Sequence, residues 1–114
     1  AGRDRRHPGG GGVTRLCGRD DLAPGEARRF DVDGCPIALV RIGDGFYAIG
    51  DTCSHAEFSL SEGYVDADEC TIECWKHGSA FSLSTGEPES LPATRPVPVY
   101  PVTVEGDDVL VTLP

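Results

Sequence analysis

The sequence contains two short motifs that each pair a cysteine with a histidine. The first is Cys53-Ser54-His55 and the second is Cys74-Trp75-Lys76-His77. Eighteen residues lie between His55 and Cys74, so the two motifs can occupy separate loops. Each loop would then offer one thiolate sulfur and one imidazole nitrogen, which both suit soft and borderline metal ions. These residue types and spacings predict a metal centre held between the two loops.

Two kinds of metal centre could use this ligand set. Structural zinc is bound tetrahedrally by two Cys and two His, and one class of [2Fe-2S] cluster has two His in place of two of its four Cys. A Cys-x-His pair with a single intervening residue is atypical of zinc domains. The spacing therefore favours the iron–sulfur cluster, and zinc is the alternative.

The succession Cys-x-His and Cys-x-x-His resembles the signature of the Rieske family. The resemblance implies that Cys53 and Cys74 bind one iron of a [2Fe-2S] cluster and that His55 and His77 bind the other. It extends over residues 13–113 and is nearest to the small soluble ferredoxins that serve ring-hydroxylating oxygenases. The fold it implies is an all-β, Rieske-type antiparallel β-sandwich with a small inserted cluster-binding subdomain.

The ligand types also bear on the reduction potential. Two ferric ions, two sulfides and two thiolates sum to zero charge when the imidazoles are neutral, whereas a four-thiolate cluster carries two more negative charges. The cluster with two His therefore accepts an electron more readily. Rieske centres have potentials of roughly −150 to +300 mV, compared with about −400 mV for plant-type ferredoxins.

Departures from the high-potential members of the family refine this expectation. Those members have an extra Cys in each loop, where this sequence has Phe58 and Lys76, so no disulfide can form there. They also have a Ser and a Tyr that donate hydrogen bonds to the cluster or its ligands. This sequence keeps the Ser as Ser79 and has Phe81 in place of the Tyr. We therefore expect a potential in the lower part of the Rieske range; the alternative role for Ser79 is a bond to a backbone carbonyl.

Two further side chains flank the second motif. Trp75 and Lys76 are expected to be partly exposed and to shape the contact with a redox partner. The alternative for Trp75 is a lid that shields the cluster from water.

Length and composition are typical of a small electron carrier. The chain has 114 residues and a formal net charge of −9, which predicts one domain and makes nucleic acid an unsuitable partner. It has no apolar run long enough to cross a bilayer and no secretory signal at its start. Five cysteines form an odd number that argues against a disulfide framework. We expect a cytoplasmic monomer without membrane contact.

The rest of the chain predicts short strands separated by turns. Residues 1–12 contain four consecutive glycines and no large apolar side chain, so we expect a flexible tail followed by one Rieske domain over residues 13–114. The cluster-binding subdomain is expected at about residues 52–82. Asp33-Gly34 predicts a two-residue hairpin turn between strands at 27–32 and 35–42. Cys70 is expected in a strand as a small buried apolar residue.

The leading hypothesis for function is a one-electron carrier between a flavoprotein reductase and a terminal oxygenase, and therefore not an enzyme in its own right. A second hypothesis is a ferredoxin that serves iron–sulfur cluster assembly. A third is a Rieske-like module of a larger reductase system. An oxygenase active site would need a further 2-His-1-carboxylate iron centre, and His7 is the one histidine outside the two motifs.

Overall fold

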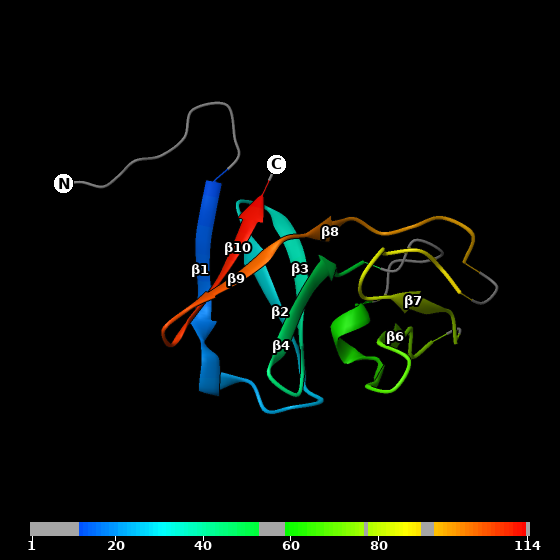
Figure 1. Ribbon diagram of the computed structural model, residues 1–114. Coiled ribbons are helices and arrows are strands. Elements are labelled where there is room, and N and C mark those ends of the chain that lie inside the picture. The colour runs from blue at the N-terminus through cyan, green and yellow to red at the C-terminus, as the bar shows by residue number, and fades with distance from the viewer. Residues whose placement is uncertain (1–11, 53–58, 77, 90–92, 114) are drawn as a thin grey trace.

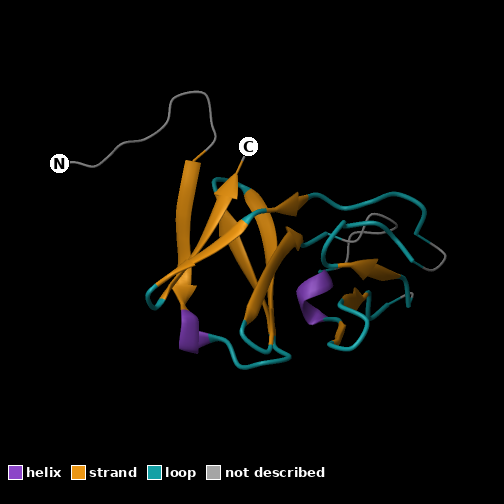
Figure 2. Cartoon of the chain, viewed as in Figure 1, coloured by secondary structure: helices purple, strands orange, loops and turns teal. Residues whose placement is uncertain are grey.

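The computed structural model describes residues 12–52, 59–76, 78–89 and 93–113, and in these residues it is built almost entirely of β-strands (Figure 2). The described part contains no α-helix, and its two helical turns are of the 3-10 type. In chain order the elements are β1 (Gly12–Gly18), η1 (Arg19–Asp21), β2 (Ala27–Val32), β3 (Cys35–Ile42), β4 (Gly45–Gly50), η2 (Leu60–Glu62), β5 (Tyr64–Asp66), β6 (Thr71–Glu73), β7 (Ala80–Ser82), β8 (Val99–Tyr100), β9 (Val102–Glu105) and β10 (Asp108–Leu113). The all-β prediction is confirmed.

The strands form three antiparallel sheets. The first has the order β1-β10-β9, the second β2-β3-β4-β8 and the third β5-β6-β7. Figure 1 shows the second sheet between the other two, with β6 and β7 at the opposite end of the molecule from β1. The third sheet lies between β4 and β8 in the sequence, so the chain leaves the second sheet, builds the third and then returns.

The hairpin between β2 and β3 forms as the sequence predicts. Val32 pairs with Cys35, and Asp33 and Gly34 between them have φ of 51° and 79°. Positive φ at both central positions is what a type I′ turn requires, and the twist of that turn matches the twist of the flanking strands.

Strand β3 is buried on both faces and separates two hydrophobic cores. Ile37 and Leu39 belong to the first core, which includes Val109 and Val111 of β10. Ala38 and Val40, which point the opposite way because side chains alternate along a strand, belong to the second core. The other buried members of the second core are Ile49, Leu60, Ile72, Cys74, Phe81, Leu83, Ala93 and Val97. The middle sheet therefore supports the sandwich on one side and the third sheet on the other.

Glycine is needed where the proline-rich segment returns from the third sheet. Gly86 has φ of 77°, and a Cβ built on it would lie 2.1 Å from the carbonyl oxygen of Val97. Val97 N–H in turn donates to Gly86 O at 2.8 Å. This close backbone approach fixes the segment that crosses back to β8.

The prediction that Cys70 lies in a strand was wrong. Cys70 ends the turn that precedes β6 and has φ of 57°, a left-handed conformation that few residues other than glycine adopt. It is half-buried rather than buried, and its Sγ lies 3.9 Å from Ser84 Oγ. The Asp66 side chain accepts bonds from the backbone N–H groups of Asp68 and Glu69, and such local bonds favour a turn over a strand.

Two other predictions concern the chain ends and the membrane. Gly12, the last residue of the predicted tail, begins β1, and residues 1–11 lie outside the described part. Within the described ranges, no helix has the length and apolar character that crossing a membrane would take.

Candidate metal centre

The structure describes one of the four predicted ligands. Cys74 follows β6 directly, has no exposed surface and belongs to the second core. Cys53, His55 and His77 lie outside the described residues. Within the described ranges, no group of three or more Cys, His, Asp or Glu side chains could hold a metal ion, as is expected when three of the four predicted ligands are not included.

The chain around Cys74 forms a tight turn between β6 and β7. Cys74 N–H donates to Ser79 O at 2.7 Å, and Gly78 N–H donates to Cys74 O at 2.9 Å. Gly78 has φ of 77°, which glycine adopts at little cost. These bonds fix the backbone on both sides of the position of His77.

The first ligand loop begins and ends at paired residues. Thr52 and Ser59 form an antiparallel bridge, so the two residues that flank 53–58 lie side by side. Leu60, one residue after the bridge, is fully buried in the second core together with Cys74. The segment that closes the first loop and the cysteine that opens the second therefore pack in the same core.

The tip of the second loop carries an exposed aromatic ring. Trp75 is 51% exposed, and Lys76 Nζ lies 5.9 Å from the centroid of its ring. About half of the Trp75 surface is thus accessible to solvent, which favours the contact role over the lid.

Ser79 is fully buried and its hydroxyl oxygen is already bonded. Ser79 Oγ accepts a hydrogen bond from Ala93 N–H at 3.0 Å. Its own proton still needs an acceptor, and no carbonyl among the described residues accepts it. The Ser79 hydroxyl thus keeps its proton for donation to a further acceptor. Phe81 is buried in the second core, where Ile72 faces it across β6 and β7.

The remaining cysteines are poorly placed to replace a ligand. Cys17 and Cys35 pack in the first core, on the other side of the middle sheet from Cys74. Burial raises the pKa of the Cys17 thiol and so disfavours the thiolate that a metal needs. Interaction with the Cys70 thiol raises the pKa of the Tyr47 hydroxyl on β4.

The sequence-based reasoning missed the residues that hold the first loop. Asp51, Ser59 and Ser61 form a hydrogen-bonded network at the base of this loop. One signal was available, because a carboxylate follows the apolar strand β4 directly and precedes the first ligand by two residues.

Comparison with known proteins places the chain in a family. The Rieske [2Fe-2S] domain family matches residues 12–101. The ferredoxin component of biphenyl 2,3-dioxygenase from Rhodococcus jostii (strain RHA1) is 46% identical over 101 residues, which cover 89% of this chain and 92% of that protein. The chain belongs to the Rieske [2Fe-2S] family, whose domain binds a [2Fe-2S] cluster.

Solved structures agree with this assignment. The ferredoxin of carbazole 1,9a-dioxygenase from Nocardioides aromaticivorans IC177 superposes with a TM-score of 0.85 at 43% identity, covering 87% of this chain and 95% of that one. A ferredoxin solved in complex with the oxygenase of carbazole 1,9a-dioxygenase gives a TM-score of 0.81 at 45% identity, covering 87% and 91%. The chain is therefore similar over most of its length to small ferredoxins of dioxygenase systems.

Replacing Cys70 by Ser should leave the iron content and the EPR spectrum unchanged, because Cys70 lies in the turn before β6 and is not one of the proposed ligands. The free energy of unfolding should change by about 0.5 kcal/mol or less, as for other partly exposed positions. Cys74→Ser is the matched comparison and should disrupt the normal cluster. Loss of iron from Cys70→Ser would mean that the wrong thiol had been assigned.

Replacing Ser79 by Ala should lower the reduction potential. A hydrogen bond donated to the cluster or its ligand sulfurs favours the reduced state, and a net bond of about 0.5–1.5 kcal/mol corresponds to roughly 20–65 mV for one electron. Protein-film voltammetry measures the shift. Ser84→Ala, an exposed serine in the next turn, is the control and should show none. Phe81→Tyr should raise the potential if its hydroxyl reaches a ligand sulfur, and an unshifted Ser79→Ala would contradict this account.

Proposed function

We propose that the chain is a one-electron carrier whose [2Fe-2S] cluster is bound by Cys53, His55, Cys74 and His77. Cys53 and Cys74 would supply two thiolates to one iron, and His55 and His77 would supply two neutral imidazoles to the other. When bound, the cluster supplies reversible one-electron chemistry. The protein would act as a carrier that serves an enzyme, and not as a catalyst itself.

The observation that carries this proposal is the environment of Cys74. It has no exposed surface, lies in a turn fixed by two backbone bonds, and packs in the same core as the residue that closes the first loop. A buried thiol mounted this rigidly is suited to a cluster that must change charge without rearrangement of its ligands. Two sulfur and two nitrogen donors also match the ligand set of the family.

The proposed partners are a terminal oxygenase, which accepts the electron, and a flavoprotein reductase, which supplies it. The relatives described above are ferredoxins of dioxygenases, and one was solved in complex with its oxygenase. This favours service to an oxygenase over iron–sulfur assembly or a place in a larger reductase. We further propose that the chain acts as a cytoplasmic monomer, with residues of about 52–82 as its cluster-binding part.

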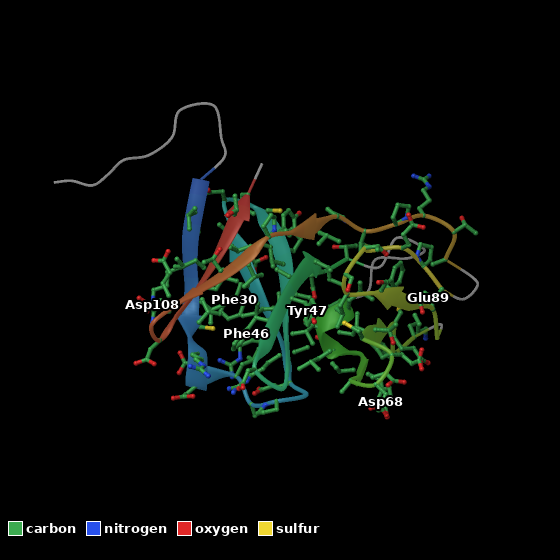
Figure 3. The ribbon with its side chains drawn as sticks, viewed as in Figure 1. Phe30, Phe46, Tyr47, Asp68, Glu89 and Asp108 are labelled. Atoms are coloured by element: carbon green, nitrogen blue, oxygen red, sulfur yellow. The ribbon has the colours of Figure 1, made fainter. Side chains whose placement is uncertain are left out.

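Charge is distributed in a way that suits a basic partner surface. Residues 59–89 contain seven carboxylates and one lysine, and Figure 3 shows Glu89 near β7, far from Asp108 at the other end of the molecule. The Glu73 carboxylate approaches the second ligand loop, since a Cβ on Gly78 would lie 3.4 Å from it. In the first two sheets, by contrast, arginines offset carboxylates, as Arg15 does for Asp108 at 2.7 Å.

Purification of the chain with intact iron tests the proposal directly. The protein should be red-brown and contain two irons and two sulfides per chain, because the four proposed ligands suit this cluster. After anaerobic reduction, EPR should give a rhombic signal with an average g below that of all-thiolate [2Fe-2S] clusters. His55→Ala and His77→Ala should each lose the normal cluster. A colourless protein with one zinc per chain would contradict the proposal and favour the alternative.

Electron transfer to the oxygenase should slow as ionic strength rises, because exposed charges are screened beyond about 8 Å at physiological salt. At low salt, Glu73→Gln and Glu89→Gln should each reduce the second-order rate roughly two- to fivefold. Stopped-flow absorbance with the reduced ferredoxin measures the rate. Asp108→Asn removes an equal charge at the far end of the molecule and should have little effect. Equal rates for all three variants, or no dependence on salt, would exclude electrostatic steering through this face.

A further inference from the structure

Asp51 is a buried carboxylate at the point where the chain leaves the middle sheet for the first ligand loop. It directly follows β4, and its exposed fraction is 1%. Among the described residues, it is the one acidic side chain that is buried. Burial of a carboxylate is unfavourable unless hydrogen bonds and a counter-charge compensate it. The groups that compensate Asp51 therefore indicate what it does.

The Asp51 side chain binds the segment that follows the loop. Its Oδ1 accepts a hydrogen bond from Ser61 N–H at 2.8 Å, and its Oδ2 accepts one from the Ser59 hydroxyl. The hydroxyl oxygens of Ser59 and Ser61 lie 2.8 Å apart. A carboxylate only accepts hydrogen bonds, so Ser59 donates to Asp51 and Ser61 donates to Ser59. One side chain thereby fixes both serines.

The backbone of Asp51 reinforces the same connection. Leu60 N–H donates to Asp51 O at 2.6 Å, and Asp51 N–H donates to Pro36 O on β3 at 3.0 Å. The next residue, Thr52, forms an antiparallel β-bridge with Ser59. The residues that flank 53–58 are thus paired with each other, and Asp51 connects this pair to the middle sheet.

The counter-charge to Asp51 is weak. Arg29 Nη1 lies 3.8 Å from Asp51 Oδ2, but Arg29 is half-exposed and also pairs with Asp31 at 3.0 Å. Because Arg29 already pairs with Asp31, an ion pair with Arg29 does not explain why Asp51 is buried. The shorter contacts of Asp51 are the bonds to Ser59, Leu60 and Ser61 that close the loop.

We propose that Asp51 is a positioning residue for Cys53 and His55, and that its buried negative charge lowers the reduction potential. This inference rests on the proposed function, in which Cys53 and His55 bind the cluster. Closing the loop at its base limits the positions that its two ligands can take relative to Cys74. A fixed negative charge beside the loop opposes the addition of an electron.

The test compares Asp51→Asn and Ser59→Ala with Asp31→Asn. Asp31→Asn also removes one partner of Arg29 and one negative charge, but at an exposed site on β2. Protein-film voltammetry gives the potential, and the rate of iron release to a chelator reports how firmly the loop holds its ligands. The free energy of unfolding is measured for every variant.

For Asp51→Asn we expect the equilibrium constant for reduction to rise about threefold to tenfold. We also expect Asp51→Asn and Ser59→Ala to release iron about tenfold faster, since each loses a hydrogen bond to a charged group. Asp31→Asn should stay within about twofold of the unmodified protein in both measurements.

The inference is overturned if Asp51→Asn and Ser59→Ala match Asp31→Asn in potential and in iron release while the unmodified protein holds its cluster. If Asp51→Asn does not fold, Ser59→Ala decides through iron release alone, because it keeps the charge and removes one hydroxyl. An unmodified protein without a [2Fe-2S] cluster would instead overturn the proposed function, so the two failures are distinguishable.

Discussion

The structure depends on one strand of the middle sheet, β3, that is buried on both faces. Residues 37–40 of β3 have no exposed surface, and alternate side chains enter the first and the second core. A strand can be apolar on both faces only when another layer covers each face. One layer is the sheet β1-β10-β9, and the other is the part of the chain that contains the candidate metal centre. The candidate site therefore packs against the core of the protein.

This arrangement explains how two loops from different parts of the chain can act together. The first loop leaves the end of β4 and is closed at Asp51, which is bonded to β3. The second loop joins β6 to β7, and its Cys74 is buried in the second core. Both loops are thus mounted on packed strands, and rigid elements hold metal ligands more accurately than free loops do.

Packing also separates the four described cysteines by role. Cys17 and Cys35 fill the first core as small apolar side chains. Cys70 occupies a turn in a left-handed conformation. Its sulfur lies near Ser84 Oγ, and the side chain packs, like Tyr47, against the second core. Cys74 alone among the described cysteines lies in a loop next to a position expected to bind metal. Cys74 also packs in a core, so its place directly after β6, in the predicted second ligand loop, distinguishes it from the other described thiols.

The sequence by itself determined the features that depend on local chemistry. Two Cys-His motifs predicted the cluster and Asp33-Gly34 predicted a hairpin turn, because ligand types and positive φ depend on residues adjacent in the sequence. Tertiary structure decided what depends on distant partners. It supplied Ala93 N–H to Ser79 and brought Ser59 and Ser61 to the carboxylate of Asp51. Local patterns cannot encode these contacts, since each exists only after separate strands have packed together.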